Sequence, residues 1–129
     1  MTVAQIIWLL EETILAIHHR QIAEHGGSEG LRDPGLLSSA LARPQNLLAY
    51  AEPQADLATL AASYAYGISR DHSFVDGNKR TSLVAARTFL LLNGANLEAT
   101  QDEKFLIFLQ LAEGTLNERQ LADWIRQRM

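Results

Sequence analysis

Apolar residues recur every three or four positions along most of this chain, and that spacing is the strongest constraint on its fold. It is typical of amphipathic helices, whose buried face repeats about every 3.6 residues. Beyond a possible short hairpin near Ser28–Arg32, no segment shows the alternation of a β-strand. Hydrophobic residues make up 47% of the 129 positions, which is enough for one core. We therefore predict an all-α fold, a compact single-domain helical bundle covering residues 1–129.

The first predicted helix has apolar residues at helical spacing over Val3–Ile17. Thr2 and Gln5 form a capping-box pattern at its start. We expect the helix to end near Gly26–Gly27, because glycine tolerates the left-handed backbone of a helix end. The polar stretch Ser28–Arg32 follows and indicates an exposed loop or a short hairpin.

Prolines suggest the boundaries of the next two helices. Asp33–Pro34 has the form of an N-cap and a first-turn proline. This second helix should end before Pro44, because a proline disfavours helical geometry in the residue before it. Gln45–Glu52 is then a connecting segment, and Pro53 opens a third helix with a buried face that continues to Ile68. The helical pattern is interrupted at Arg70–Gly77, and the helix that follows stops at Asn93–Gly94. The next helix begins with a capping box of Thr100 with Glu103 and ends at Gly114. A last helix runs from about Asn117 toward Arg128.

Charge and composition exclude several functions. The 11 Lys and Arg against 15 Asp and Glu argue against a direct nucleic-acid partner, which needs a dense basic face. The chain has no cysteine, so it has neither disulfides nor thiolate metal ligands. The apolar run Ile6–Leu10 is too short for an export signal or a membrane span. We expect a cytoplasmic protein with no membrane partner.

Polar residues that can bind ligands or take part in catalysis are concentrated in His72–Thr81, between two amphipathic helices. A loop that runs into a helix start presents unpaired backbone N–H groups with partial positive charge. Gly77 allows close approach of a ligand, and Asn78 adds a side-chain donor. Lys79 and Arg80 oppose the helix dipole there, which costs stability unless an anion binds. A polyphosphate is the natural occupant.

His72 and Asp76 complete this set. A neutral imidazole can remove a proton from an attacking hydroxyl, and a carboxylate beside phosphates most often holds magnesium. Phe74, between them, should point into the core and fix the loop. Taken singly, each residue is better explained as a surface or turn feature. Together and in this order they favour phosphoryl or nucleotidyl transfer.

The segment resembles the signature of the Fic/Doc superfamily, His-x-Phe-x-[Asp/Glu]-Gly-Asn-Gly-Arg-x-x-Arg. Lys79 stands where Fic proteins have glycine, and Leu83 stands where they have the second arginine. Asn-Lys-Arg-Thr in place of Asn-Gly-Arg is typical of the death-on-curing (Doc) branch. The matching residues are His72, Phe74, Asp76, Gly77, Asn78 and Arg80.

The resemblance implies ATP and Mg²⁺ as cofactors and a role for each motif residue. His72 is then the general base and Asp76 the metal ligand, and both act with Lys79 and Arg80 in catalysis. The residues expected to bind the nucleotide are Gly77, Asn78, Lys79, Arg80 and Thr81. Ser28–Arg32 corresponds to the family's flap, which positions the target segment by strand addition, although a plain solvent loop is an equal interpretation.

Doc-like proteins are toxins of type II toxin–antitoxin systems. The resemblance implies a protein kinase that transfers the γ-phosphate of ATP to a threonine hydroxyl of elongation factor Tu and so inhibits translation. It also implies a Phd-like antitoxin that binds through a flexible C-terminal segment. Leu83 removes an arginine clamp on the terminal phosphates, which favours this kinase reaction over AMP transfer. The alternatives are a Fic-type AMP transferase and a non-catalytic binding module.

Further histidines and tyrosines lie outside the motif. We interpret His18, His19 and His25 as solvated residues near the end of the first helix. Tyr64 and Tyr66 either line the groove beside the motif or only pack.

Overall fold

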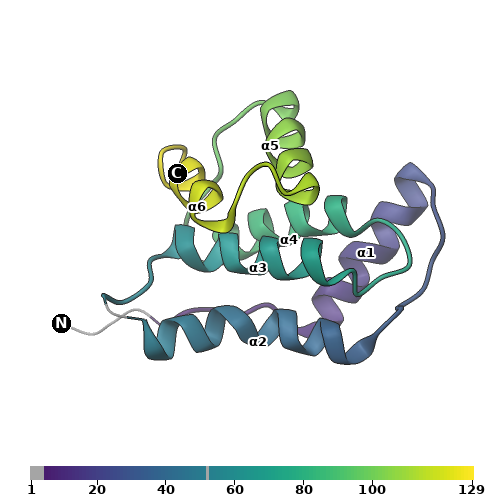
Figure 1. The fold of residues 1–129 in the computed structure, drawn as a ribbon, viewed down its shortest axis with the longest axis horizontal. Coiled ribbons are helices and arrows are strands. Elements are labelled where there is room, and N and C mark those ends of the chain that lie inside the picture. Colours follow the sequence, from purple (N-terminus) through teal and green to yellow (C-terminus); the bar gives the residue numbers. More distant parts are fainter. Residues whose placement is uncertain (1–4, 52) are drawn as a thin grey trace.

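A computed structural model describes residues 5–51 and 53–129 of the chain, and these form six helices without a strand (Figure 1). This architecture confirms the predicted all-α bundle. The helices are α1 (Glu11–His25), α2 (Pro34–Tyr50), α3 (Leu57–Asp71), α4 (Asn78–Leu92), α5 (Gln101–Glu113) and α6 (Glu118–Arg126). None of the helices in the described part of the chain combines the length and hydrophobicity of a membrane span.

Helix α3 lies at the centre and packs against α2, α4 and α6 (Figure 1). Its run of alanines, with Gly67 and Ser63, lets the neighbouring helices approach closely. Tyr64 is fully buried on this helix, and its ring packs against Phe89 of α4 at 5.0 Å between centroids. Burial raises the pKa of the Tyr64 hydroxyl, which accepts a hydrogen bond from the Leu9 amide. This packing fixes the two helices that hold the motif between them.

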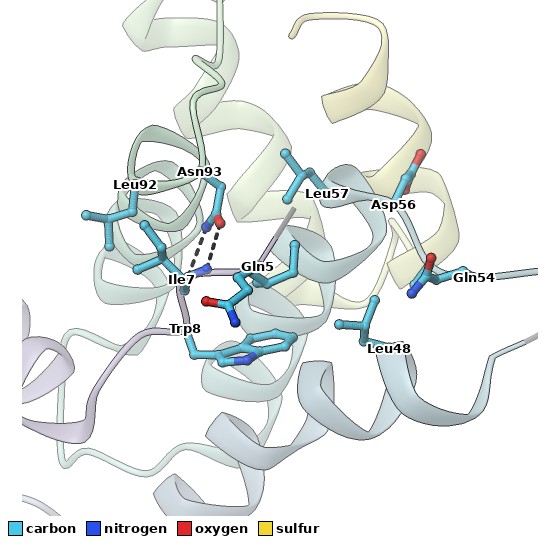
Figure 2. Close-up of a pocket in the computed structure, with 11 residues that line it drawn as sticks. Gln5, Ile7, Trp8, Leu48, Gln54, Asp56, Leu57, Leu92 and Asn93 are labelled. Atoms are coloured by element: carbon cyan, nitrogen blue, oxygen red, sulfur yellow. Dashed lines mark hydrogen bonds between the residues drawn. The ribbon is translucent and has the colours of Figure 1, made fainter. Parts of the chain in front are cut away.

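The first helix begins at Glu11, so the prediction that it covers the preceding apolar residues was wrong. Residues 5–10 are not helical, and within them the backbone of Ile7 and the amide of Leu9 form hydrogen bonds to distant parts of the fold. The Asn93 side chain donates to the Ile7 carbonyl and accepts from the Ile7 amide, at 2.9 and 2.8 Å (Figure 2). Thr2, of the predicted capping box, lies outside the described residues. The helix ends at His25 with Gly26 as its C-cap, in agreement with the predicted end near Gly26–Gly27.

Helix α2 continues through Pro44 to Tyr50, so the predicted stop and the predicted connecting segment were both wrong. The proline ring is buried, and the turn after it places Leu47 and Leu48 against the core. Apolar packing therefore outweighs the one hydrogen bond that a proline removes. Pro53 is not a first-turn proline either, since α3 begins at Leu57.

Several helix ends agree with the local sequence signals. Asp33 caps α2 by accepting from the Leu36 amide at 3.1 Å. Thr100 and Glu103 form the predicted reciprocal capping box of α5, and Gly114 ends that helix in the left-handed conformation. Helix α6 starts after Asn117, which is also its N-cap.

Candidate active site

The motif loop, residues 72–77, connects the end of α3 to the start of α4. His72 is the residue after α3 and has left-handed backbone angles, φ 50° and ψ 50°. Its side chain is exposed. Gly77 is the N-cap of α4 at φ 77°, and a Cβ there would come within 3.1 Å of Ile22. The left-handed turns at both ends of the loop bring the imidazole and the start of α4 to one cleft.

Phe74 is buried, as predicted, and its backbone is held by Asn78. The Asn78 side chain accepts from the Phe74 amide at 3.1 Å and donates to the Phe74 carbonyl at 3.0 Å. These bonds close the loop onto the first turn of α4. One N–H of the Asn78 side-chain amide is thus engaged with the loop, so its second side-chain N–H and its backbone N–H are the donors it can offer a ligand.

The Asp76 carboxylate lies between the motif and the loop that follows α1. One oxygen accepts from the Gly77 amide at 2.8 Å, and the other accepts from the Ser28 amide at 3.3 Å. Glycine suits position 27 beside it, because the backbone there has φ 121°, which L side chains rarely adopt, and a Cβ would lie 2.7 Å from the second carboxylate oxygen. The carboxylate is exposed at the cleft and held in one orientation.

His18 is a site residue that our sequence interpretation missed. We predicted a solvated helix end, but the side chain is only 4% exposed. Its ring stacks on Phe74 with 3.8 Å between centroids and 8° between planes, and its Nε2 lies 2.7 Å from the Asp76 carbonyl oxygen. The signal was available, because His18 follows Ile14 and precedes Ile22 at the four-residue spacing of a buried face. His19 and His25 are exposed, as predicted.

The loop of residues 28–32 is attached to the motif at its base. Leu31 forms an isolated antiparallel bridge with Phe74, and the Val75 amide donates to the Gly30 carbonyl at 3.0 Å. The Arg32 guanidinium donates to the carbonyls of His72 and Asp71, at 2.7 and 2.9 Å. The backbone beside His72 is thereby tied to the loop.

A cleft of about 410 Å³ opens where these elements meet. Lys79 leans toward α5, with its Nζ 4.9 Å from the centroid of the Phe105 ring. Thr81 is fully buried and is not part of the cleft wall, unlike the other predicted site residues. The residues that line the cleft are Gln21, Ile22, Gly26, Ser69, His72, Val75, Asp76, Gly77, Asn78, Lys79, Arg80, Leu109 and Ala112.

The tyrosines do not line this cleft. Tyr64 is in the core, and Tyr66 lies beneath the Arg43 guanidinium, 4.8 Å from its ring centroid. Packing is therefore their role. A larger hollow of about 810 Å³ lies at the opposite end of α3, beside Leu57, and contains no motif residue (Figure 2).

Comparison with known proteins gives a family for the chain. Residues 8–90 match the model of the Fic/DOC family. Protein kinase doc of Escherichia phage P1 is 34% identical over 116 residues, which cover 90% of each chain. Toxin Doc of Mycolicibacterium smegmatis is 41% identical over 93 residues, 72% of this chain and 67% of that relative. The match includes the whole motif loop and the His18 helix, and the chain belongs to the Fic/DOC family.

Proposed function

We propose that this protein is a Doc-type toxin kinase that transfers the γ-phosphate of ATP to a threonine hydroxyl of a protein, with elongation factor Tu as the target. The observation that carries the proposal is the cleft in which His72, Asp76 and the first turn of α4 meet. The relatives named protein kinase doc and Toxin Doc support the kinase and toxin parts of this proposal.

The start of α4 fits a polyphosphate. The first hydrogen bond within this helix runs from the Thr81 amide to the Gly77 carbonyl, so the three preceding amides lie ahead of the helical bonding pattern. The N-cap makes no side-chain hydrogen bond, and the first turn has no acidic residue. Ser69 adds a buried hydroxyl on the cleft wall that has no hydrogen-bond partner among the described residues. The three amides can donate to phosphate oxygens.

Asp76 fits a single-carboxylate Mg²⁺ site. Within residues 5–51 and 53–129, no three His, Cys, Asp or Glu side chains converge as a protein-only metal site. Mg²⁺ bound with nucleotide typically uses one or two carboxylates together with phosphate oxygens and water. Each Asp76 oxygen accepts only one backbone N–H, which leaves lone pairs for a cation. When bound, Mg²⁺ offsets the negative charge of the phosphates.

His72 then acts as the general base. Its exposed imidazole takes the proton from the threonine hydroxyl while the hydroxyl oxygen bonds to the γ-phosphorus. The bond from that phosphorus to the β–γ bridging oxygen breaks, and its electron pair leaves with ADP. Lys79 and Arg80 stabilise the charge on the phosphate oxygens.

We place the target segment along the exposed loop 28–32, which runs antiparallel to the motif at Leu31 and Phe74. A Phd-like antitoxin that covers the cleft through a flexible C-terminal segment would block both the nucleotide and the target.

The decisive experiment incubates the purified protein with elongation factor Tu, Mg²⁺ and ATP labelled at either the α or the γ phosphate. We expect transfer of the γ label only, a loss of roughly 10²–10⁴-fold in the His72→Ala variant, and no transfer with EDTA. Transfer of the α label would assign AMP transfer instead. If the wild type is stably folded but transfers neither label, the protein is a non-catalytic binding module instead.

A further inference from the structure

The buried ring of His18 has no place in the reaction described above, yet it contacts two residues of the motif loop. We propose that His18 is a positioning residue that orients the Asp76 carboxylate, and thereby sets the Mg²⁺ affinity of the cleft. This inference rests on the proposed function, because it concerns the metal that accompanies ATP.

The hydrogen bond of His18 has a fixed direction. Its Nε2 lies 2.7 Å from the carbonyl oxygen of Asp76. A carbonyl only accepts, so Nε2 must carry the hydrogen and donate. The face of the same ring lies against Phe74. The imidazole is held by packing on its face and bonds through its edge.

The carbonyl that His18 binds belongs to the peptide group between Asp76 and Gly77. The N–H of that same peptide donates to the Asp76 carboxylate at 2.8 Å. A trans peptide is planar, with its C=O and N–H pointing in opposite directions, so one cannot turn without the other. His18 therefore holds the peptide plane from one side, and the plane presents its N–H to the carboxylate on the other.

The second carboxylate oxygen has a weaker support. The Ser28 amide lies 3.3 Å away, at the long end of hydrogen-bond distances. Without the His18 bond, the Asp76–Gly77 peptide loses the restraint on its carbonyl, and the N–H that is the carboxylate's better donor is held less firmly. Residues that orient a metal ligand in this way typically change metal affinity by about 10- to 100-fold when they are replaced.

Two variants separate orientation from packing. His18→Phe keeps an aromatic ring against Phe74 but removes the donor. His18→Gln keeps an N–H donor at similar reach but removes the ring. If His18 orients Asp76, the phenylalanine variant should need roughly tenfold more Mg²⁺ for half-maximal transfer, with kcat at saturating Mg²⁺ close to wild type. The glutamine variant should melt lower but keep a Mg²⁺ requirement near that of the wild type.

The test measures γ-phosphate transfer and fluorescent ATP-analogue binding as Mg²⁺ is titrated, together with thermal unfolding. His25→Phe is the matched control, because it makes the same change at an exposed position of α1. A wild-type Mg²⁺ dependence in His18→Phe, with the larger defect in His18→Gln, would overturn the inference and leave a packing role. Inactive wild type that still binds the analogue with Mg²⁺ refutes only the proposed reaction, and absence of Mg²⁺-dependent binding refutes both.

Discussion

Arg32 should contribute to stability through the end of α3. Its guanidinium donates two hydrogen bonds to the carbonyls of Asp71 and His72, at 2.9 and 2.7 Å. The carbonyls at a helix C-terminus have no partners within the helix, and they carry partial negative charge. A cation placed there makes charge-assisted bonds and also opposes the dipole favourably. The carbonyl of His72, whose backbone is left-handed, is one of the two acceptors of this guanidinium.

The size of the effect follows from the exposure of this residue. A hydrogen bond to a charged group contributes about 1.5–3 kcal/mol when sheltered, and a cation at a helix C-terminus about 0.3–1 kcal/mol. Arg32 is exposed, so water replaces part of both. We expect Arg32→Ala to lower the free energy of unfolding by about 1.5 kcal/mol. For a chain of 129 residues, this corresponds to roughly 6 °C in Tm.

Urea unfolding and thermal melting, both followed by circular dichroism, measure this change. Arg32→Lys should fall between wild type and alanine, because an ammonium keeps the charge but cannot span both carbonyls as a fork. Arg119→Ala, at an exposed position of α6, is the control and should change stability by less than about 0.5 kcal/mol. The reasoning is refuted if Arg32→Ala unfolds at the same urea concentration as Arg119→Ala.

Two more perturbations test the core and one helix cap. Phe89→Ala removes a fully buried ring and should cost about 3–5 kcal/mol in urea unfolding, whereas Leu91→Ala, at a position 49% exposed, should cost less than about 1 kcal/mol. Hydrogen bonds from Arg126 hold the pKa of the Asp56 carboxyl well below its usual range, so the folded state favours the ionised form. The stability that this charge contributes is therefore present above about pH 4 and is lost as the pH falls below it. Asp56→Asn keeps an N-cap oxygen for Thr59 and should be less stable than wild type by about 1 kcal/mol at pH 7. This difference in the free energy of unfolding should shrink toward pH 3. A difference that stays the same at both pH values would contradict the role given to the Asp56 charge.

Helix ends were predictable where the deciding contacts are local. A cap is made by residues within four positions of one another, as with Asp33 and with Thr100 and Glu103. Distant partners decided the ends that were predicted wrongly. The segment before α1 is held out of the helix by Asn93, which is 86 positions from Ile7 in the chain.

The candidate site follows the same rule. His72, Asp76 and the first turn of α4 lie within one short segment, so the sequence alone could predict that they meet. His18 is 58 positions from Asp76, and no local sequence pattern predicts that its Nε2 bonds to the Asp76 carbonyl. Helical spacing could have predicted that His18 is buried, but the contact with the Asp76 carbonyl required the packing of α1 against α4.

Helices α4 and α5 both line the cleft but begin in opposite ways, and the difference connects stability with function. Helix α5 starts with a full capping box and with Asp102 and Glu103 in its first turn, which complement the helix dipole. Helix α4 starts with a glycine N-cap, no side-chain cap and two cations, Lys79 and Arg80. The two cations lower the stability of the ligand-free helix, and they become favourable once an anion occupies the cleft. Nucleotide binding should therefore stabilise the protein beyond the contacts of a preformed pocket, because it also removes the repulsion at the start of α4.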